Sequence, residues 1–255
     1  MYSWMKNVRQ VEPYVPGEQP KCTDLIKLNT NECPYPPAPG VEKKLKEFKV
    51  DCLRLYPDPE ASVLTSAIAD YYQVKQEEVF VGVGSDDVLG TAFLTFFNSE
   101  KPILFPNITY SFYPVWASLY GIPYETPKLK EDFTIQKEDY FKENGGIVIA
   151  NPNAPTGLEA PLSVIEEIVA KNPDVVVIVD EAYVDFGASS AYPLVEKYDN
   201  LLVVQTFSKS RAMAGMRIGF AIGNPKLIAC MNAVKFSYNS YTMNQTTLAS
   251  LSGGH

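Results

Sequence analysis

Residues 146–180 read GIVIANPNAPTGLEAPLSVIEEIVAKNPDVVVIVD, and this stretch decides the class of fold. It holds two short runs of Val and Ile, GIVIA at 146–150 and VVVIVD at 175–180, with a segment of helical periodicity between them. Strands that are apolar at nearly every position are buried on both faces, and a helix between two such strands is typical of a layered α/β sheet. The stretch therefore predicts parallel strands covered by helices.

The same alternation extends in both directions along the chain. Helices are predicted at VEKKLKEF (41–48) and ASVLTSAIADYY (61–72). Further buried strands are predicted at VFVGVG (79–84), ILF (103–105), LLVVQTF (201–207) and RIGFAIG (217–223). We therefore expect an α/β fold with a mostly parallel central sheet flanked by helices, in which ligands bind beyond the carboxyl ends of the strands.

The first 39 residues differ from the rest in composition. PYVPGEQP and NTNECPYPPAPG are rich in proline and lack sustained periodicity, so residues 1–39 are expected to form an irregular arm that lies over another part of the protein. Residues 40–255 are then the large α/β domain.

Composition excludes several classes of function. A net charge of −8 argues against nucleic-acid and anionic-membrane partners, and no apolar run approaches the length that spans a bilayer. The four cysteines form no CxxC pair, and the N-terminal residues lack the apolar core of a signal peptide, so a cytoplasmic location with reduced thiols is expected. His255 is the only histidine, which excludes histidine triads and histidine metal sites, and no metal is expected.

The residues that follow the predicted strands are candidates for a site. After VFVGV comes Gly84-Ser85-Asp86-Asp87 at the start of a helix, a sequence that suits either a phosphate cradle or an ordinary helix cap. After GIVIA comes NPNAPTG at 151–157, where two prolines and a glycine fix the directions of the asparagine amides. That loop is equally consistent with a plain tight turn.

The next two strand ends carry charged groups. Asp180 ends VVVIVD and is followed by Glu181, Ala182 and Tyr183; its carboxylate needs a partner, or else it caps a helix or faces solvent. Lys209 follows LLVVQTF, with Arg217 eight residues later. A lone lysine is usually solvated, but low-dielectric surroundings and a nearby arginine would favour the free amine, which forms imines with aldehydes.

One cofactor would use all four strand ends, namely pyridoxal 5′-phosphate (PLP). Its aldehyde suits Lys209, and its pyridine nitrogen stays protonated beside a carboxylate such as Asp180. Asn153 and Tyr183 can donate to its phenolic oxygen. Its phosphate can bind at the helix start that contains Gly84 and Asp86, where its charge can be neutralised by Ser85, Ser208 and Arg217.

Four motifs of the chain resemble those of the fold type I PLP aminotransferases: GVGSDDVL, NPNAPTG, DEAY and TFSKSRAMAGMRIGF. The resemblance covers nearly the whole chain, from about Tyr14 to Tyr241. LIKLNTNECPYPP, LRLYPDP and the order of the later motifs are similar to the histidinol-phosphate aminotransferase subfamily, which exchanges an amino group between histidinol phosphate and 2-oxoglutarate in histidine biosynthesis.

The resemblance implies roles for individual residues. Lys209 forms the imine with the cofactor and moves the substrate proton, with Asp180 and Tyr183 as the other catalytic residues. Tyr110 stacks on the pyridine ring, although packing at a helix start explains it as well. Tyr56 reaches the phosphate of the partner subunit, and Tyr14 closes over substrate, where Asn153 is also expected. Those two tyrosines imply a homodimer.

The resemblance has departures. Ala154, Arg211 and Met213 replace residues that are more usual in the family, without removing a cofactor contact. The resemblance implies that relatives continue into a small C-terminal domain that supplies arginines for the anionic group of the substrate, and we expect the 255 residues to lack most of this domain. Two alternatives stay open: a decarboxylase of the threonine-phosphate type, and a PLP-binding chain without catalytic activity.

Overall fold

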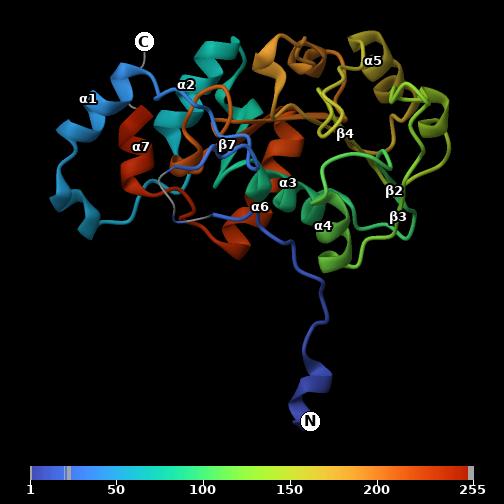
Figure 1. Cartoon of the computed structure of the whole chain (residues 1–255), viewed down its shortest axis with the longest axis horizontal. Helices are drawn as coiled ribbons and strands as arrows, with labels where there is room; N and C mark the ends of the chain where they lie inside the picture. The colour runs from blue at the N-terminus through green and yellow to red at the C-terminus, as the bar shows by residue number, and fades with distance from the viewer. Residues whose placement is uncertain (1, 20, 22–23, 252–255) are drawn as a thin grey trace.

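The computed structural model describes residues 2–19, 21 and 24–251, and its centre is a seven-stranded sheet (Figure 1). The strand order is β1-β7-β6-β5-β4-β2-β3. The strands span Val79–Gly82 (β1), Ile103–Leu104 (β2), Tyr124–Glu125 (β3), Ile147–Ala150 (β4), Val177–Asp180 (β5), Leu201–Thr206 (β6) and Gly219–Gly223 (β7).

The sheet is mostly parallel, as the sequence predicts. Strands β2 to β6 pair in parallel, and only β7 is antiparallel to its neighbours β6 and β1. Because β7 is reversed between them, β1 points in the same direction as β6. The carboxyl ends of β1, β4, β5 and β6 therefore lie at one edge of the sheet. The two-residue strand β3 was not among the strands expected from sequence.

Helices cover both faces of the sheet (Figure 1). The α-helices span Pro39–Glu47 (α1), Ser62–Tyr72 (α2), Ser85–Phe96 (α3), Tyr113–Tyr120 (α4), Leu162–Lys171 (α5), Pro225–Tyr238 (α6) and Gln245–Leu251 (α7). Short 3-10 helices lie at Ser3–Asn7, Val50–Arg54, Gln76–Glu78, Lys137–Tyr140, Val184–Phe186, Tyr192–Glu196 and Ala214–Met216. The helices predicted at 41–48 and 61–72 correspond to α1 and α2.

Alternation along the strands divides the interior into two cores. In β5, Val177 and Val179 pack with Ile68 of α2 and Ile165 of α5, whereas Ile178 faces the opposite core. That second core is formed with side chains from α3, α4 and α6. Since successive residues of a strand point to opposite faces, three consecutive apolar residues, Val177 to Val179, are what a strand covered by helices on both faces requires. Asp180, the last residue of β5, lies at the carboxyl edge of the sheet.

Apart from the 3-10 helix at Ser3–Asn7, the described residues before α1 form no helix or strand, and the two parts of this arm differ in position. Residues 2–8 extend away from the body of the protein (Figure 1). Further along, the ring of Tyr14 stacks on Phe112 with a centroid distance of 4.5 Å, and the segment around Thr30 returns to the carboxyl edge of the sheet. Within the described residues, no helix is long and apolar enough to cross a membrane.

Candidate active site

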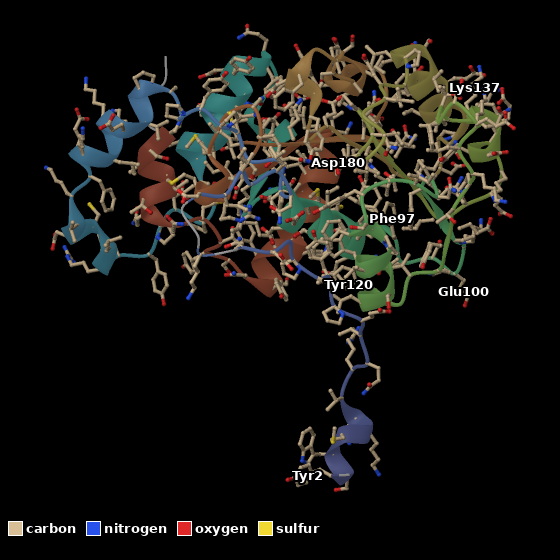
Figure 2. The ribbon with its side chains drawn as sticks, viewed as in Figure 1. Tyr2, Phe97, Glu100, Tyr120, Lys137 and Asp180 are labelled. Atoms are coloured by element: carbon tan, nitrogen blue, oxygen red, sulfur yellow. The ribbon has the colours of Figure 1, made fainter. Side chains whose placement is uncertain are left out.

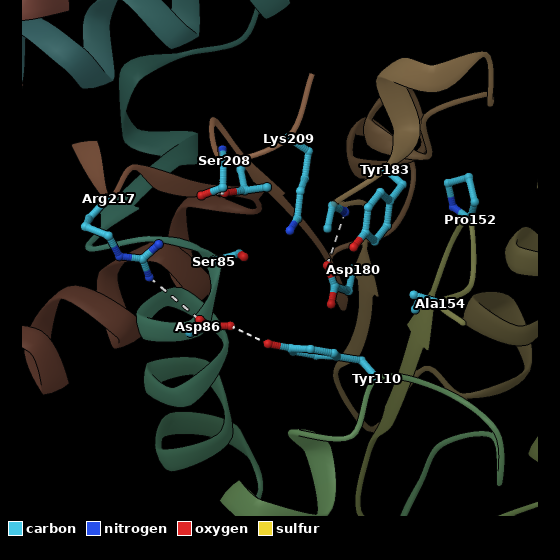
Figure 3. Close-up of a pocket in the computed structure, with 13 residues that line it drawn as sticks. Ser85, Asp86, Tyr110, Pro152, Ala154, Asp180, Tyr183, Ser208, Lys209 and Arg217 are labelled. Carbon is cyan, nitrogen blue, oxygen red and sulfur yellow. Dashed lines mark hydrogen bonds and ion pairs between the residues drawn. The ribbon is translucent and has the colours of Figure 1, made fainter. Parts of the chain in front are cut away.

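A pocket opens at the carboxyl edge of the sheet, in the middle of the molecule where Figure 2 places Asp180. The empty space in and above it is about 610 Å³, a volume that includes the open mouth. Figure 3 shows the side chains that converge on it. The lining consists of Ser85, Asp86, Tyr110, Ala150, Pro152, Ala154, Asp180, Ala182, Tyr183, Thr206, Ser208, Lys209 and Arg217.

The turn between β1 and α3 forms one wall. Gly84 has a φ of +86°, and a Cβ on this residue would lie 2.5 Å from the guanidinium of Arg217. A Cβ on Gly219 would lie 2.3 Å from the backbone nitrogen of Ser85. Only glycine allows these contacts, which bring the N-terminus of α3 and Arg217 to the same side of the pocket. The partial positive charge of a helix N-terminus and a guanidinium together favour an anion.

Asp86 connects this wall to the floor of the pocket. Its carboxylate accepts a hydrogen bond of 3.0 Å from the hydroxyl of Tyr110 and lies 3.7 Å from the guanidinium of Arg217. The ring of Tyr110 is thereby held below the pocket (Figure 3). Burial and the Asp86 charge raise the pKa of Tyr110, so this hydroxyl remains protonated and donates.

Asp180 is the buried charge of the site. The residue is 4% exposed, and its carboxylate accepts hydrogen bonds from the hydroxyl of Tyr113 at 2.7 Å and from the amide of Ala182 at 3.3 Å. No ion pair joins it to any of the described residues. Burial raises its pKa to about 6, although the hydrogen bond from Tyr113 acts in the opposite direction. A carboxyl group in this position is stabilised by a cationic ligand.

Lys209 enters the pocket from the opposite side. Its ammonium donates to the backbone oxygen of Thr30 at 2.8 Å and lies 5.6 Å from the ring centroid of Tyr183. The hydroxyl of Tyr183 accepts a hydrogen bond of 2.8 Å from the amide of Asn31. The arm segment at Thr30 and Asn31 thus contacts two of the three residues expected to be catalytic.

Glu181 has different surroundings from its neighbour Asp180. Its carboxylate accepts from Ser190, from the amide of Ala191 and from Gln205, and burial raises its pKa to about 7. The oxygen of the Gln205 side chain in turn accepts a hydrogen bond of 3.1 Å from Arg211. Glu181 does not line the pocket, so its carboxylate contributes to the buried hydrogen bonds of the surrounding protein and not to the site.

Eight of the residues expected from sequence line the pocket together: Ser85, Asp86, Tyr110, Asp180, Tyr183, Ser208, Lys209 and Arg217. Gly84 abuts Arg217. Tyr14 stacks on Phe112, outside the lining. Tyr56 is 80% exposed and stacks on Tyr241, so its contact with a partner subunit stays a prediction.

Asn153 is placed differently from the expectation. Its amide nitrogen donates to the backbone oxygen of Ile108 and to the hydroxyl of Thr156, and its side-chain oxygen accepts from Thr109. An asparagine amide has two hydrogens, and both are used. Asn153 therefore holds the 151–157 loop instead of lining the pocket. A contact with cofactor or substrate stays a prediction that requires one of these bonds to be exchanged.

Sequence reasoning missed Tyr113 and Asn31. Tyr113 lies three residues after Tyr110, a spacing that places two side chains near each other at a helix start, and this was the available signal. Asn31 lies in the motif LIKLNTNECPYPP, but nothing in the motif identifies Tyr183 as its partner. Among the described residues, no cluster of three or more His, Cys, Asp or Glu side chains is arranged to hold a metal ion.

Comparisons with known proteins find similar chains. The family model for aminotransferase class I and II matches residues 23–254. The histidinol-phosphate aminotransferase of Lactococcus lactis subsp. cremoris (strain MG1363) is 55% identical over 242 residues, which are 95% of this chain and 68% of that protein.

Two solved structures share the fold. The histidinol-phosphate aminotransferase of Sinorhizobium meliloti in complex with pyridoxal-5′-phosphate matches with a TM-score of 0.76 and 21% identity, over 87% of this chain and 62% of that chain. The L-threonine-O-3-phosphate decarboxylase of Porphyromonas gingivalis matches with a TM-score of 0.72 and 22% identity, over 83% of this chain and 63% of that chain.

Proposed function

Since this chain belongs to the class I and II aminotransferase family, we propose that it binds PLP through Lys209 and transfers an amino group between histidinol phosphate and 2-oxoglutarate. The observation that carries the proposal is the pairing of Asp180 with Lys209 in one pocket. Asp180 is a buried carboxylate without a cation among the described residues, and Lys209 is an amine facing the same space.

The residues present fit PLP. Its protonated pyridine nitrogen would supply the cation that Asp180 lacks, and a charge-assisted hydrogen bond between them is stronger than a neutral one. Tyr110 offers a ring face below the pocket. The N-terminus of α3, Ser85, Ser208 and Arg217 together offer donors and positive charge for the phosphate.

When bound, PLP supplies an aldehyde for amines and a protonated ring that withdraws electrons from the substrate carbon. The amine of Lys209 has two tasks, namely attachment of the cofactor and movement of the substrate proton. Tyr113 keeps Asp180 oriented toward the pocket through its 2.7 Å hydrogen bond. The ring of Tyr183 lies near Lys209 in the pocket lining, and its hydroxyl can donate to a ring oxygen of PLP.

The choice of histidinol phosphate rests on the relatives. The Lactococcus protein at 55% identity is a histidinol-phosphate aminotransferase, and amino transfer to 2-oxoglutarate is the exchange expected of that subfamily in histidine biosynthesis. That relative is longer than this chain, and we propose that its further residues form a small domain which binds the anionic group of the substrate. PLP binding does not depend on that domain, because the proposed ligands within this chain lie before residue 218.

We also propose a homodimer in the cytoplasm. Tyr56 and its neighbours present an exposed apolar surface, which suits contact with a second copy of the chain. Cys33, Cys52 and Cys230 are free thiols, which suits a reducing compartment; Cys22 lies outside the described residues.

The test compares this chain with a version extended by the C-terminal third of the Lactococcus relative. PLP uptake is measured by visible absorbance, and amino transfer is measured as glutamate formed from histidinol phosphate and 2-oxoglutarate. Both forms should take up PLP with similar affinity. Transfer should be at least about tenfold faster in the extended form, because one contact to a charged group is worth roughly that factor. Lys209→Ala in the extended form is the control and should abolish transfer.

Two results would refute the proposal. One is the absence of PLP uptake by both forms. The other is release of carbon dioxide from threonine phosphate at a rate above that of amino transfer, which would assign the chain to the decarboxylases instead.

A further inference from the structure

The arm contributes a hydrogen bond to the pocket through Asn31. The amide nitrogen of Asn31 donates to the hydroxyl of Tyr183 across 2.8 Å. Tyr183 is half-buried and lines the pocket, as Lys209 does, whereas Asn31 is exposed. The two residues are 152 positions apart in the sequence, so the contact depends on the arm crossing the carboxyl edge of the sheet.

A phenol hydroxyl has one hydrogen to donate and lone pairs to accept with. Because the N–H of Asn31 occupies an acceptor position, the hydrogen of Tyr183 must point elsewhere. Within the described part of the chain, this hydroxyl donates to no side chain or backbone oxygen. A hydroxyl that accepts a hydrogen bond is also polarised into a better donor. The hydrogen bond from Asn31 therefore leaves the Tyr183 hydrogen available for another acceptor and makes the hydroxyl a stronger hydrogen-bond donor.

The backbone of the arm is held in position for this contact. Asn31 has a φ of 52°, in the left-handed region that asparagine tolerates better than most residues. The oxygen of the preceding residue, Thr30, accepts from Lys209, and the Thr30 hydroxyl accepts from Lys27 at 2.8 Å. Lys27 also donates to Glu32 at 2.6 Å. The two bonds of Lys27, which do not involve the cofactor lysine, thus fix the residues on both sides of Asn31.

We propose that Asn31 is a positioning residue that directs the O–H of Tyr183 toward the ring oxygen of the bound cofactor. The proposal rests on the proposed function, because it needs PLP in the pocket. PLP attached to Lys209 would carry a titratable proton on the lysine nitrogen, and loss of that proton would leave the negative charge of the ring oxygen without its cation. A donating Tyr183 would stabilise that charge. A stronger donor therefore lowers the pH at which the proton is lost.

The experiment is a pH titration of the visible absorbance of the PLP-loaded protein. Asn31→Gly removes the amide, and glycine keeps the left-handed backbone without strain. The midpoint should rise by about 0.4 to 1 pH unit, which corresponds to the net strength of one hydrogen bond. Asn31→Asp should raise it at least as far, because a carboxylate only accepts and draws the Tyr183 hydrogen away from the pocket.

Two further variants separate this role from a general effect on the arm. Asn29→Ala removes a nearby asparagine whose side chain donates to Glu18 in the arm, and the midpoint should not change. In a Tyr183→Phe background, Asn31→Gly should also leave the midpoint unchanged, since the effect passes through the Tyr183 hydroxyl.

An unchanged midpoint in Asn31→Gly, or an equal shift in the Tyr183→Phe background, overturns this proposal while PLP binding stands. A chain that shows no PLP absorbance at any pH overturns the proposed function and this proposal with it.

Discussion

Asp180 and Glu181 are adjacent carboxyl groups with separate tasks. The end of β5 directs one toward Tyr113 and the pocket, and the other toward Ser190 and Gln205 behind it. Burial raises the pKa of both, but only Asp180 lines the space where a ligand can compensate its charge. Burying a carboxylate costs free energy, and of these two groups only Asp180 can recover that cost when a cationic ligand binds in the pocket.

This gives a pH dependence for the PLP-free chain. The pKa of Asp180 is about 6 in the folded state, against an ordinary value of 3.8, so the folded state holds its proton more tightly than the unfolded state. The stability that this contributes is present below pH 3.8 and is lost as pH rises through about 6. The loss from this one group amounts to about 3 kcal/mol in the free energy of unfolding.

Urea unfolding of the wild type and of Asp180→Asn, measured between pH 4 and 7, checks this expectation. The variant carries no charge at this position, so its unfolding free energy should decline less steeply with pH. The decline that remains belongs in part to Glu181, whose raised pKa acts in the same direction. Parallel pH profiles in the two proteins would contradict the assigned pKa of Asp180.

Sequence predicts the residues that stand directly at strand ends, because strand direction alone brings them to one edge. Lys209 and Asp180 are of this kind. Tyr113 and Asn31 are not, since each reaches its partner across elements, from 67 and 152 positions away. Their contacts depend on how α4 and the arm pack. The bonds of the Asn153 amide to Ile108 and Thr156 could not be predicted for a related reason, because they depend on how the loop closes.

At the scale of elements, the pocket wall that favours an anion is formed by the N-terminus of α3 and Arg217. Its shape depends on how closely the β1–α3 turn approaches β7. Gly219→Ala would place a methyl group 2.3 Å from the backbone of Ser85 and push the N-terminus of α3 away. Such overpacking costs about 1 to 3 kcal/mol of stability. PLP affinity should fall as well, because the helix N-terminus and Arg217 no longer face the phosphate together.

Gly215→Ala is the matched control, because a Cβ there meets nothing within 4 Å. Its unfolding free energy should stay within about 0.5 kcal/mol of the wild type. Both variants are measured by urea unfolding and by PLP titration. Equal behaviour of the two alanine variants would show that the contact between the turn and β7 does not matter for binding.

The positions of the longer strands could be read from sequence because both of their faces are buried, which leaves near-continuous apolar runs. The direction of β7 could not, because the apolar pattern of RIGFAIG is the same in parallel and antiparallel pairing. The short strand β3 carries exposed residues at Tyr124 and Glu125, so it has no such pattern.

At the scale of the whole molecule, an exposed apolar surface surrounds Tyr56. Val50, Leu53 and Leu55 are 72%, 55% and 53% exposed, next to Tyr56 at 80%. Exposed apolar side chains close together in the sequence favour association with another protein surface. We expect a homodimer by sedimentation at micromolar concentration, and Leu53→Asp should shift it toward monomer.

Phe133→Asp is the control for that shift, since Phe133 is 50% exposed in a different part of the chain. It should leave the sedimentation coefficient unchanged. A wild-type monomer, or an equal shift in both variants, would exclude this surface as the dimer contact.

The central claim is that this chain holds PLP on Lys209, opposite Asp180. The most direct measurement is reduction of the PLP-loaded protein with borohydride, followed by peptide mapping of the modified lysine. The pocket geometry predicts a single adduct on Lys209, because it is the lysine that lines the space between Tyr183 and Asp180. An adduct on another lysine, or none at all, would contradict it.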